Sequence, residues 1–369
     1  MQEIKIPLDW PDIGKLEKDY IIKALESGYV SSAGPLVREF EQRFAAYLGI
    51  SHAVAVVNGT AGLHLALKLL GIGPGDEVIV PALTFIATVN PVVYVGARPV
   101  VVDVDPRTWN IDPAAIEKAI TKRTRAIIPV HLYGNLADMD AILGLAREYG
   151  LYVIEDATEA LGSTYKGKKA GTFGHIGVFS FNGNKIITTS GGGMLVTEDP
   201  ELASRAKILV NQGREPGETE YEHKEIGFNY RLTNLQAALG LAQLERLPEF
   251  LAAKRRNAAV YRQQLQGIPG LSWQQELPGA ESNWWLFSIL INEEEYGESK
   301  KAFMARLNSH GIQVRPLFKP IPWQPCYSHY SLPPCPVAAI LYAGGINLPS
   351  ASFLKQDDIM SVCAKLSCR

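Results

Sequence analysis

Two polar residues of this chain stand where they could do chemistry on a charged organic ligand. Lys185 follows a tight Asn-Gly turn in FSFNGNKIITTSGGGM, beside hydroxyl residues and three glycines that permit close backbone approach. Asp156 ends the apolar run VIED. Each is ambiguous alone, since most lysines at turns are solvated. Asp156 could equally be a surface cap, a metal ligand or a partner for a cation.

A third segment, Asn58-Gly59-Thr60-Ala61, lies where an apolar run passes into a helical pattern. The N-terminus of a helix presents unpaired backbone N–H groups and a partial positive charge, which suit a phosphate. Gly59 would let the backbone approach a ligand, and Thr60 adds a hydroxyl. An ordinary helix cap would explain the same residues.

Together, a lysine, a carboxylate and a phosphate seat are the protein groups that pyridoxal phosphate requires. Lys185 would form a Schiff base with the cofactor aldehyde and then carry a proton. Asp156 would keep the pyridine nitrogen protonated, because an ion pair at about 4 Å is worth roughly 4 kcal/mol, or about three pKa units. Phe85 is a candidate to stack on the ring, although a core aromatic fits the same pattern.

The elements that must position these residues follow a strand–helix alternation. Apolar runs at 53–57, 77–81, 99–105, 125–131 and 151–157 are predicted strands, and helical patterns separate them. Such alternation predicts parallel strands joined by crossover helices in an α/β layered sheet. Ligands of open parallel sheets bind at the carboxyl ends of the strands, where the candidate residues lie.

The last third of the chain has a different pattern. A long helix is predicted from about Thr233 to Gln266, passing Pro248, and further helices at 300–309 and 355–365. We therefore expect a large cofactor-binding domain over residues 1–248 and a smaller C-terminal α+β domain over 249–369. The Pro-rich stretch 316–336 is predicted to be a long ordered loop or a cover over a site.

Composition excludes several classes of function. The 369 residues include 36 basic and 38 acidic side chains, and no basic run indicates a nucleic-acid surface. No apolar stretch reaches the roughly 18–20 residues that cross a bilayer, so we expect a cytoplasmic protein without a membrane segment. The four cysteines lack the close pairing of a zinc knuckle, and no metal site is expected.

Several longer motifs resemble the DegT/DnrJ/EryC1/StrS family of nucleotide-sugar aminotransferases. The family contains fold-type I pyridoxal-phosphate enzymes with a large, mostly parallel α/β/α sheet domain and a smaller C-terminal α+β domain. The resemblance covers nearly the whole chain. It is carried by SGYVSSAGPLVREFEQRFAAYLG, PALTFIATVNPV, PVHLYGN, VIEDATEALGS, FSFNGNKIITTSGGGM and IGFNYRLTNLQAALGLAQLERL.

The resemblance implies roles for single residues in the cofactor site. It places the Schiff-base lysine at Lys185 and the pyridinium partner at Asp156. The residues that it assigns to the cofactor phosphate are Thr60, Ala61 and Ser180. Phe85 takes the stacking position.

Two further positions follow from the same resemblance. Glu159 stands where many members have glutamine, close to the 3-hydroxyl of the cofactor. Asn229 matches the residue that reaches the cofactor phosphate from the partner subunit, which implies a homodimer with shared active sites. Without the family, Asn229 would be interpreted as a turn residue before the long helix.

The substrate expected from the resemblance is a nucleotide-linked keto-deoxy sugar. NGNKIITT looks like the branch that aminates UDP-linked 4-keto-6-deoxy-N-acetylhexosamines, with glutamate as amino donor in a ping-pong reaction. Arg231 is a candidate anchor for a carboxylate or phosphate, or a structural arginine at a helix start. Trp323 stands in PWQP, where relatives often have histidine before Gln-Pro, and could stack on a sugar or base or anchor the loop.

Two other functions share the scaffold. The chain could be a pyridoxal-phosphate lyase or dehydratase acting on a keto-deoxy sugar, but dehydrating relatives have lost the lysine that Lys185 retains. It could also be a cofactor-binding regulator without catalysis. The intact Lys185 and Asp156 favour the aminotransferase.

Overall fold

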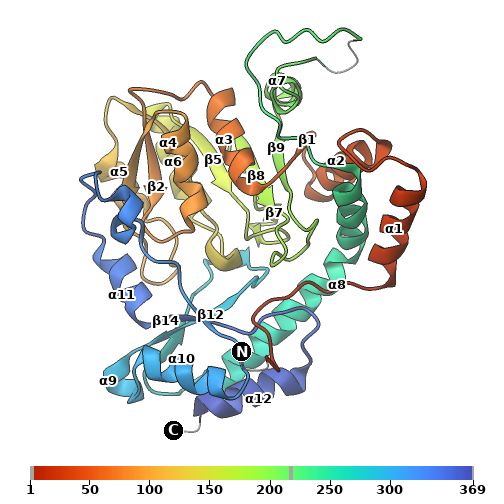
Figure 1. The fold of residues 1–369 in the computed structure, drawn as a ribbon. Coiled ribbons are helices and arrows are strands. Elements are labelled where there is room, and N and C mark those ends of the chain that lie inside the picture. The colour runs from red at the N-terminus through yellow and green to blue at the C-terminus, as the bar shows by residue number, and fades with distance from the viewer. Residues whose placement is uncertain (1–3, 216–218, 368–369) are drawn as a thin grey trace.

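The computed structural model describes residues 4–215 and 219–367. Over these residues the protein is built around a seven-stranded sheet with the order β1-β9-β8-β5-β4-β2-β3 (Figure 1). Its strands are β1 (His52–Val56), β2 (Glu77–Pro81), β3 (Arg98–Val102), β4 (Thr124–Ile127), β5 (Tyr152–Asp156), β8 (Ile176–Ser180) and β9 (Gly193–Thr197). Neighbouring strands pair in parallel from β3 to β8, while β9 is antiparallel to both β8 and β1. The predicted mostly parallel α/β sheet is confirmed.

Helices cover both faces of this sheet. They are α1 (Lys15–Glu26), α2 (Pro35–Leu48), α3 (Gly59–Leu69), α4 (Asn90–Tyr94), α5 (Pro113–Ala119), α6 (Met139–Tyr149) and α7 (Pro200–Val210). Alternate residues of β1 enter different cores: Val54 and Val56 pack with α3 and α4, and Ala53 and Ala55 pack with α2 and α6. A sheet buried on both faces explains why its strands appear as continuous apolar runs.

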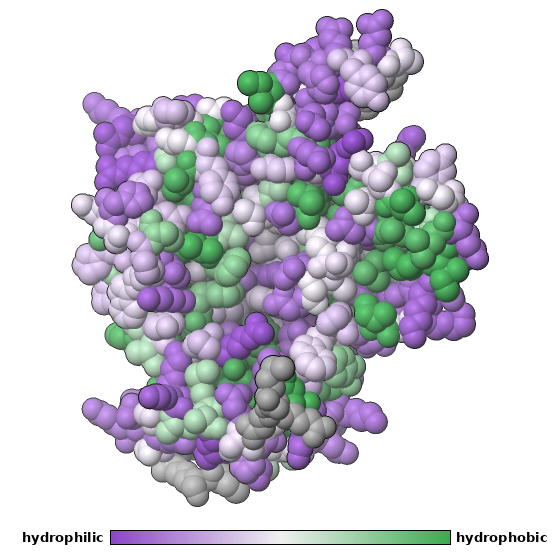
Figure 2. All heavy atoms as spheres, in the orientation of Figure 1, coloured by the Kyte–Doolittle hydropathy of each residue, from purple (hydrophilic) through white to green (hydrophobic). Residues whose placement is uncertain are grey.

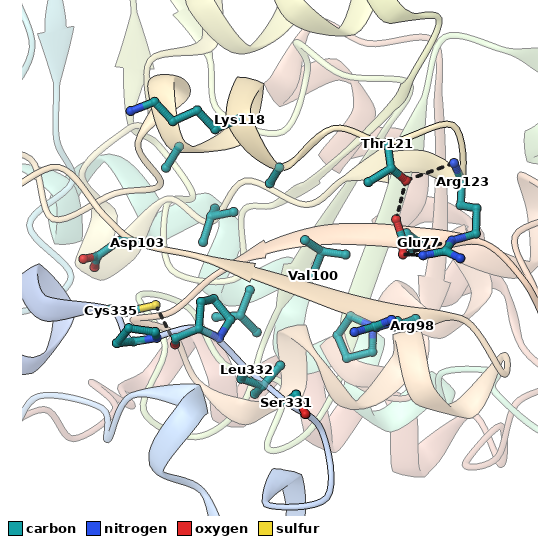
Figure 3. Close-up of a pocket in the computed structure, with 17 residues that line it drawn as sticks. Glu77, Arg98, Val100, Asp103, Lys118, Thr121, Arg123, Ser331, Leu332 and Cys335 are labelled. Carbon is teal, nitrogen blue, oxygen red and sulfur yellow. Dashed lines mark hydrogen bonds and ion pairs between the residues drawn. The ribbon is translucent and has the colours of Figure 1, made fainter.

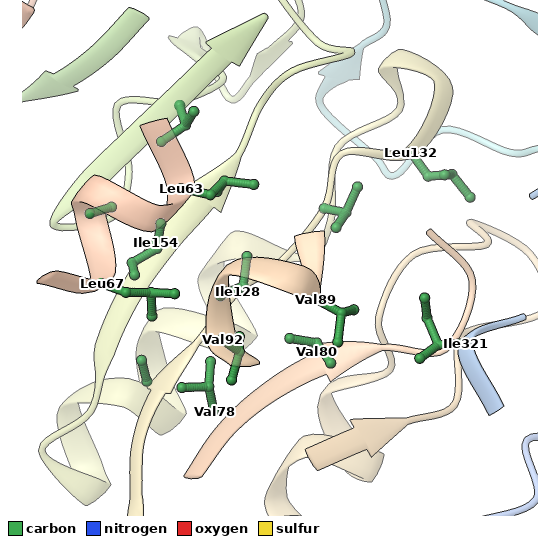
Figure 4. Close-up of a cluster of buried hydrophobic side chains, with 14 of the residues drawn as sticks. Leu63, Leu67, Val78, Val80, Val89, Val92, Ile128, Leu132, Ile154 and Ile321 are labelled. Atoms are coloured by element: carbon green, nitrogen blue, oxygen red, sulfur yellow. The ribbon is translucent and has the colours of Figure 1, made fainter. Parts of the chain in front are cut away.

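The core on the α3 and α4 face is shown in Figure 4. Leu63 and Leu67 of α3 lie over Ile154 of β5, and Val89 and Val92 lie over β2. The opposite core contains an aromatic group from α2 and the end of β8: Phe40, Phe44, Phe179 and Phe181, with ring centroids 5.1–6.0 Å apart. These two cores fix the sheet from which the site is built.

The C-terminal part has a sheet and a core of its own. Its antiparallel sheet has the order β10 (Leu271–Trp273), β12 (Phe287–Ile291), β14 (Gly345–Leu348), β13 (Arg315–Pro316). Its helices are α9 (Glu293–Tyr296), α10 (Lys300–Ser309), α11 (Pro336–Gly344) and α12 (Gln356–Ser367). A separate apolar cluster joins this sheet to α12 and to the end of α8 (Asn234–Leu265). The remaining short strands β6 (Thr164–Tyr165), β7 (Lys168–Lys169) and β11 (Ala280–Glu281) form a small third sheet.

Several sequence predictions can be compared with these elements. The long helix past Pro248 is confirmed as α8, which begins at a capping box formed by Thr233 and Gln236. Pro91 lies in the first turn of α4, where a proline is tolerated, and η1 (Ile86–Thr88) ends just before this helix. The proposed boundary after residue 248 falls inside α8, and the division into two domains stays a prediction. Within the described ranges, no helix is both long and apolar enough to cross a membrane.

Candidate cofactor site

The carboxyl ends of β5 and β8 and the N-terminus of α3 border a cavity of about 470 Å³. Six of the predicted site residues line it. They are Thr60, Phe85, Asp156, Glu159, Ser180 and Lys185. Because these residues come from five different segments, the parallel sheet brings together what the sequence separates.

Asp156 is the last residue of β5 and is buried at the floor of the cavity. Its Oδ2 accepts a hydrogen bond from the Thr88 hydroxyl at 2.7 Å, and its Oδ1 accepts one from the Thr158 hydroxyl at 2.7 Å. Among the ion pairs of the described residues, none includes Asp156. A buried carboxylate that meets hydroxyls and no protein cation is suited to a cationic ligand group.

Lys185 extends from the turn after β8 toward Glu159. The lysine Nζ lies 3.6 Å from Glu159 Oε1, and Glu159 Oε2 accepts a hydrogen bond from the Tyr133 N–H at 2.7 Å. Burial raises the pKa of Glu159 to about 7, and Asp156 acts in the same direction, while Lys185 acts against it. A carboxyl with this pKa changes its protonation in the neutral range.

The turn from β1 to α3 forms the predicted phosphate seat. Asn58 caps α3, its Oδ1 accepting from the Ala61 N–H at 2.8 Å, while Thr60 faces the cavity opposite Ser180. Glycine at position 59 allows the turn to approach Thr158 closely, because a Cβ there would stand 3.0 Å from Thr158 Cγ2. The seat combines a helix N-terminus with two hydroxyls, which suits a phosphate. Ala61 is buried outside the cavity wall, and its phosphate contact stays a prediction.

Phe85 stands at the rim of the cavity, with 53% of its surface exposed. Its ring centroid lies 5.5 Å from that of Phe318, which comes from the Pro-rich stretch. One end of the Pro-rich stretch therefore borders the cavity. A cover over the site would have this position. The stacking role of Phe85 stays a prediction.

Three predicted residues lie outside the walls of this cavity. Asn229 and Arg231 are exposed on the segment that follows α7, where each forms an isolated bridge, to Asn211 and to Val56. Trp323 is 47% exposed in η3 (Ile321–Trp323), and its ring packs edge-on against Tyr342. The geometry within one chain gives these three residues no contact with the cavity.

The cavity also contains residues that the sequence did not single out. They include Thr88, Thr158, Asn182, Asn184, Trp285, Arg315 and Phe318. The two threonines stand two or three residues from candidates already identified, and a search for hydroxyls near the acid could have found them. Trp285, Arg315 and Phe318 come from the C-terminal part, and nothing in the local pattern connects them to the lysine.

A second cavity of about 430 Å³ lies beside β3 and the segment before α11 (Figure 3). Its carboxylates are paired within the protein: Glu77 pairs with Arg123 at 2.7 Å, and Asp103 accepts from two N–H groups at the start of α11. Burial raises the pKa of Cys335 to about 12, which leaves its thiol protonated. We assign no chemistry to this cavity.

Comparison with known proteins gives a consistent result. Residues 11–367 match the model of the DegT/DnrJ/EryC1/StrS aminotransferase family. The chain is 45% identical to a GDP-perosamine synthase of Caulobacter vibrioides, covering 98% of this chain and 97% of that protein, and 42% identical to one of Escherichia coli O157:H7, covering 98% of each. The crystal structure of S. venezuelae DesV with a ketimine intermediate superposes with a TM-score of 0.89 at 37% identity, covering 95% of this chain and 93% of DesV.

Proposed function

Because the chain belongs to the DegT/DnrJ/EryC1/StrS aminotransferase family and is a pyridoxal-phosphate-dependent aminotransferase of nucleotide sugars, we propose that it transfers the amino group of glutamate to a nucleotide-linked keto-deoxy sugar. One observation supports this above the others. A single cavity contains a primary amine, a buried carboxylate that pairs with no cation among residues 4–215 and 219–367, and a helix N-terminus with two hydroxyls.

The described residues fit the cofactor. When bound, pyridoxal phosphate supplies an electron-accepting ring to which an amine substrate can be linked. Asp156 would accept a hydrogen bond from the ring N–H, and the N-terminus of α3 with Thr60 and Ser180 would hold the phosphate. The Nζ of Lys185 would move a proton from the Cα of the amino donor.

The proposal also concerns which sugar nucleotide is the substrate. Two relatives at 45% and 42% identity are named for making GDP-perosamine, which favours a GDP-linked keto sugar. The motif NGNKIITT resembles instead the branch that aminates UDP-linked 4-keto-6-deoxy-N-acetylhexosamines. We propose the GDP-linked sugar as the first substrate and keep the UDP-linked sugar as the alternative.

We also propose that the protein is a homodimer in which Asn229 reaches the partner's site. Two side chains of the segment after α7 are almost fully exposed although apolar or aromatic, Tyr221 at 85% and Ile226 at 91%. Figure 2 shows further apolar side chains gathered over the region of α1, which carries Ile22 and Leu25. Exposed apolar surface of this kind is typical of a protein–protein interface.

The proposed reaction is tested with glutamate and a panel of GDP-, UDP- and dTDP-linked keto sugars, scored by mass for replacement of oxygen by an amine. Lys185→Arg should abolish both turnover and the cofactor colour, with a loss of at least about 10³-fold. The matched control is Lys68→Arg, at an exposed lysine of α3. Turnover and colour that persist in Lys185→Arg would contradict the proposal. A regulator would leave the cofactor absorbance unconverted by glutamate, and a dehydratase would give a sugar product that has lost water without gaining an amine.

A further inference from the structure

Trp285 makes two contacts with the turn that carries the lysine. Its ring is buried, and the Nζ of Lys185 lies 3.8 Å from the ring centroid. Its indole N–H donates a hydrogen bond of 2.6 Å to the carbonyl oxygen of Asn184, the residue before the lysine. One side chain therefore fixes both the backbone of the turn and the end of the lysine side chain.

Trp285 is itself held from several sides. Its backbone N–H donates to Asn283 Oδ1 at 2.8 Å, and its carbonyl oxygen accepts from Lys254 Nζ at 3.0 Å. The ring lies 6.2 Å from that of Tyr133, which stacks in turn on Phe318. Trp285 precedes β12 in the C-terminal part, whereas Lys185 follows β8 of the large sheet. The contact thus connects the two parts of the molecule at the reactive amine.

The Nζ of Lys185 lies between two groups that attract a cation. The π-face of Trp285 is on one side and the carboxyl of Glu159, at 3.6 Å, is on another. Both interactions gain strength where water is excluded, and Glu159 and Trp285 are both buried. A side chain that only filled space would need neither this ring orientation nor the bond to Asn184.

We propose that Trp285 is a positioning residue for Lys185, receiving the ε-amino group whenever that group is not bonded to the cofactor. This inference rests on the proposed function. In the proton-transfer step, the neutral amine would take one proton from the substrate Cα, become an ammonium, and deliver that proton to the former aldehyde carbon of the cofactor. Trp285 stabilises that ammonium within reach of the substrate. Its hydrogen bond to Asn184 holds the turn in place, so the lysine side chain does not move away from the substrate.

Two substitutions separate the two contacts. Trp285→Phe retains an aromatic face and loses the bond to Asn184, while Trp285→Leu loses both. The matched control is Trp284→Phe, because Trp284 is the adjacent buried tryptophan and packs away from the lysine, against Phe287 and Arg262. Thermal melting identifies any variant that fails to fold. If Trp285→Leu fails to fold, Trp285→Phe still tests the proposal.

The first readout is the single-turnover rate at which glutamate converts the absorbance of the bound cofactor. We expect a loss of about 100-fold in Trp285→Leu, about 10-fold in Trp285→Phe and less than about twofold in Trp284→Phe. The dependence of the cofactor absorbance on pH without substrate should also shift in the two Trp285 variants and stay unchanged in Trp284→Phe. A purely structural role would not move that pH profile.

The second readout uses the cofactor-free protein and does not depend on turnover. Acetic anhydride acylates neutral amines, so losing the stabilisation of the ammonium should speed labelling of Lys185 about fivefold or more in Trp285→Leu, measured by peptide mass spectrometry. Equal labelling and equal rates in Trp285→Leu and Trp284→Phe would overturn the inference. If the wild type fails to react with glutamate, the proposed function fails, and the labelling still decides the role of Trp285.

Discussion

At the scale of single residues, the two carboxyls of the site differ in their surroundings. Asp156 accepts hydrogen bonds from two threonine hydroxyls. Glu159 accepts one backbone N–H and faces the lysine amine, and burial brings its pKa to about 7. Glu159 therefore gains or loses a proton near neutral pH.

Replacing Glu159 by glutamine should change how stability depends on pH. The pKa of Glu159 in the folded protein lies above the ordinary value of 4.5, so its favourable contribution is present below about pH 4.5 and is lost as the pH rises through about 7. The melting temperature of Glu159→Gln relative to the wild type should therefore rise by a few degrees over that interval, in cofactor-free protein.

The control for this experiment is Glu148→Gln, at an exposed position near the end of α6. Its difference from the wild type should stay nearly constant over the same pH range. A constant difference for Glu159→Gln as well would show that Glu159 titrates near its ordinary value in the folded protein.

How far the sequence predicts the site depends on the distance between the contributing segments. Lys185 and Asp156 could be placed together because Asp156 ends β5, Lys185 follows β8, and these two strands are parallel neighbours. Trp285 could not, because its contact depends on how the C-terminal part packs on the sheet. Asn229 and Arg231 lie away from the cavity of their own chain, so only the resemblance connects Asn229 to a site, and only its guanidinium chemistry suggests Arg231.

At the scale of elements, β9 supports the turn that forms the phosphate seat. A Cβ on Gly193, the first residue of β9, would stand 2.7 Å from the Phe179 carbonyl oxygen and 2.8 Å from the carbonyl carbon of Asn58. Both atoms belong to backbone that cannot move aside as a flexible side chain can. The start of α3 and the end of β8 can be this close only because residue 193 is glycine.

Gly193→Ala should therefore displace the turn and weaken cofactor binding. We expect a stability loss of about 1–3 kcal/mol and a fall in cofactor affinity of about tenfold or more, measured by melting and by absorbance titration. The matched control is Gly144→Ala in α6, where a Cβ meets nothing within 4 Å. The control should be neutral or slightly stabilising. Unchanged affinity in Gly193→Ala would show that the seat tolerates the displacement.

Local patterns indicate an element wherever that element buries a regular face. The four-residue spacing of Phe40 and Phe44 is typical of a helix, and they lie in α2. The short apolar run at 77–81 is typical of a buried strand, and it forms β2. The reversed direction of β9 was not predicted, since a buried strand has the same pattern in either direction. Pairing with β1 and β8 decides that direction, and pairing is a property of the whole sheet.

At the scale of the whole molecule, Lys254 connects segments that are far apart in the chain. Its Nζ donates to Asp9 Oδ1 at 3.0 Å, to the carbonyl oxygen of Trp285 at 3.0 Å and to that of Ser350 at 2.8 Å. Burial raises the pKa of Asp9 to about 6, although Lys254 acts against this, and burial lowers the pKa of Lys254. The pair ties the N-terminal segment to α8 and to the C-terminal part.

Lys254→Met should be strongly destabilising, because it leaves the buried Asp9 without its partner. We expect a loss of about 3–5 kcal/mol in the free energy of unfolding, measured by urea denaturation. The double variant Asp9→Leu with Lys254→Met should recover most of this loss, since it removes both charges. Lys301→Met, at an exposed position of α10, is the control. A double variant as unstable as the single one would show that the carbonyl bonds, and not the charge pair, carry the effect.

The unbroken course of α8 has a consequence for how substrates enter and leave. This one helix packs against α1 and α2 near its start and against α12 near its end (Figure 1). A rotation of the C-terminal part about a hinge would have to bend α8, which continues through Pro248. We therefore expect access to the cavity to change mainly by movement of the segments at its mouth, around Phe85 and Phe318.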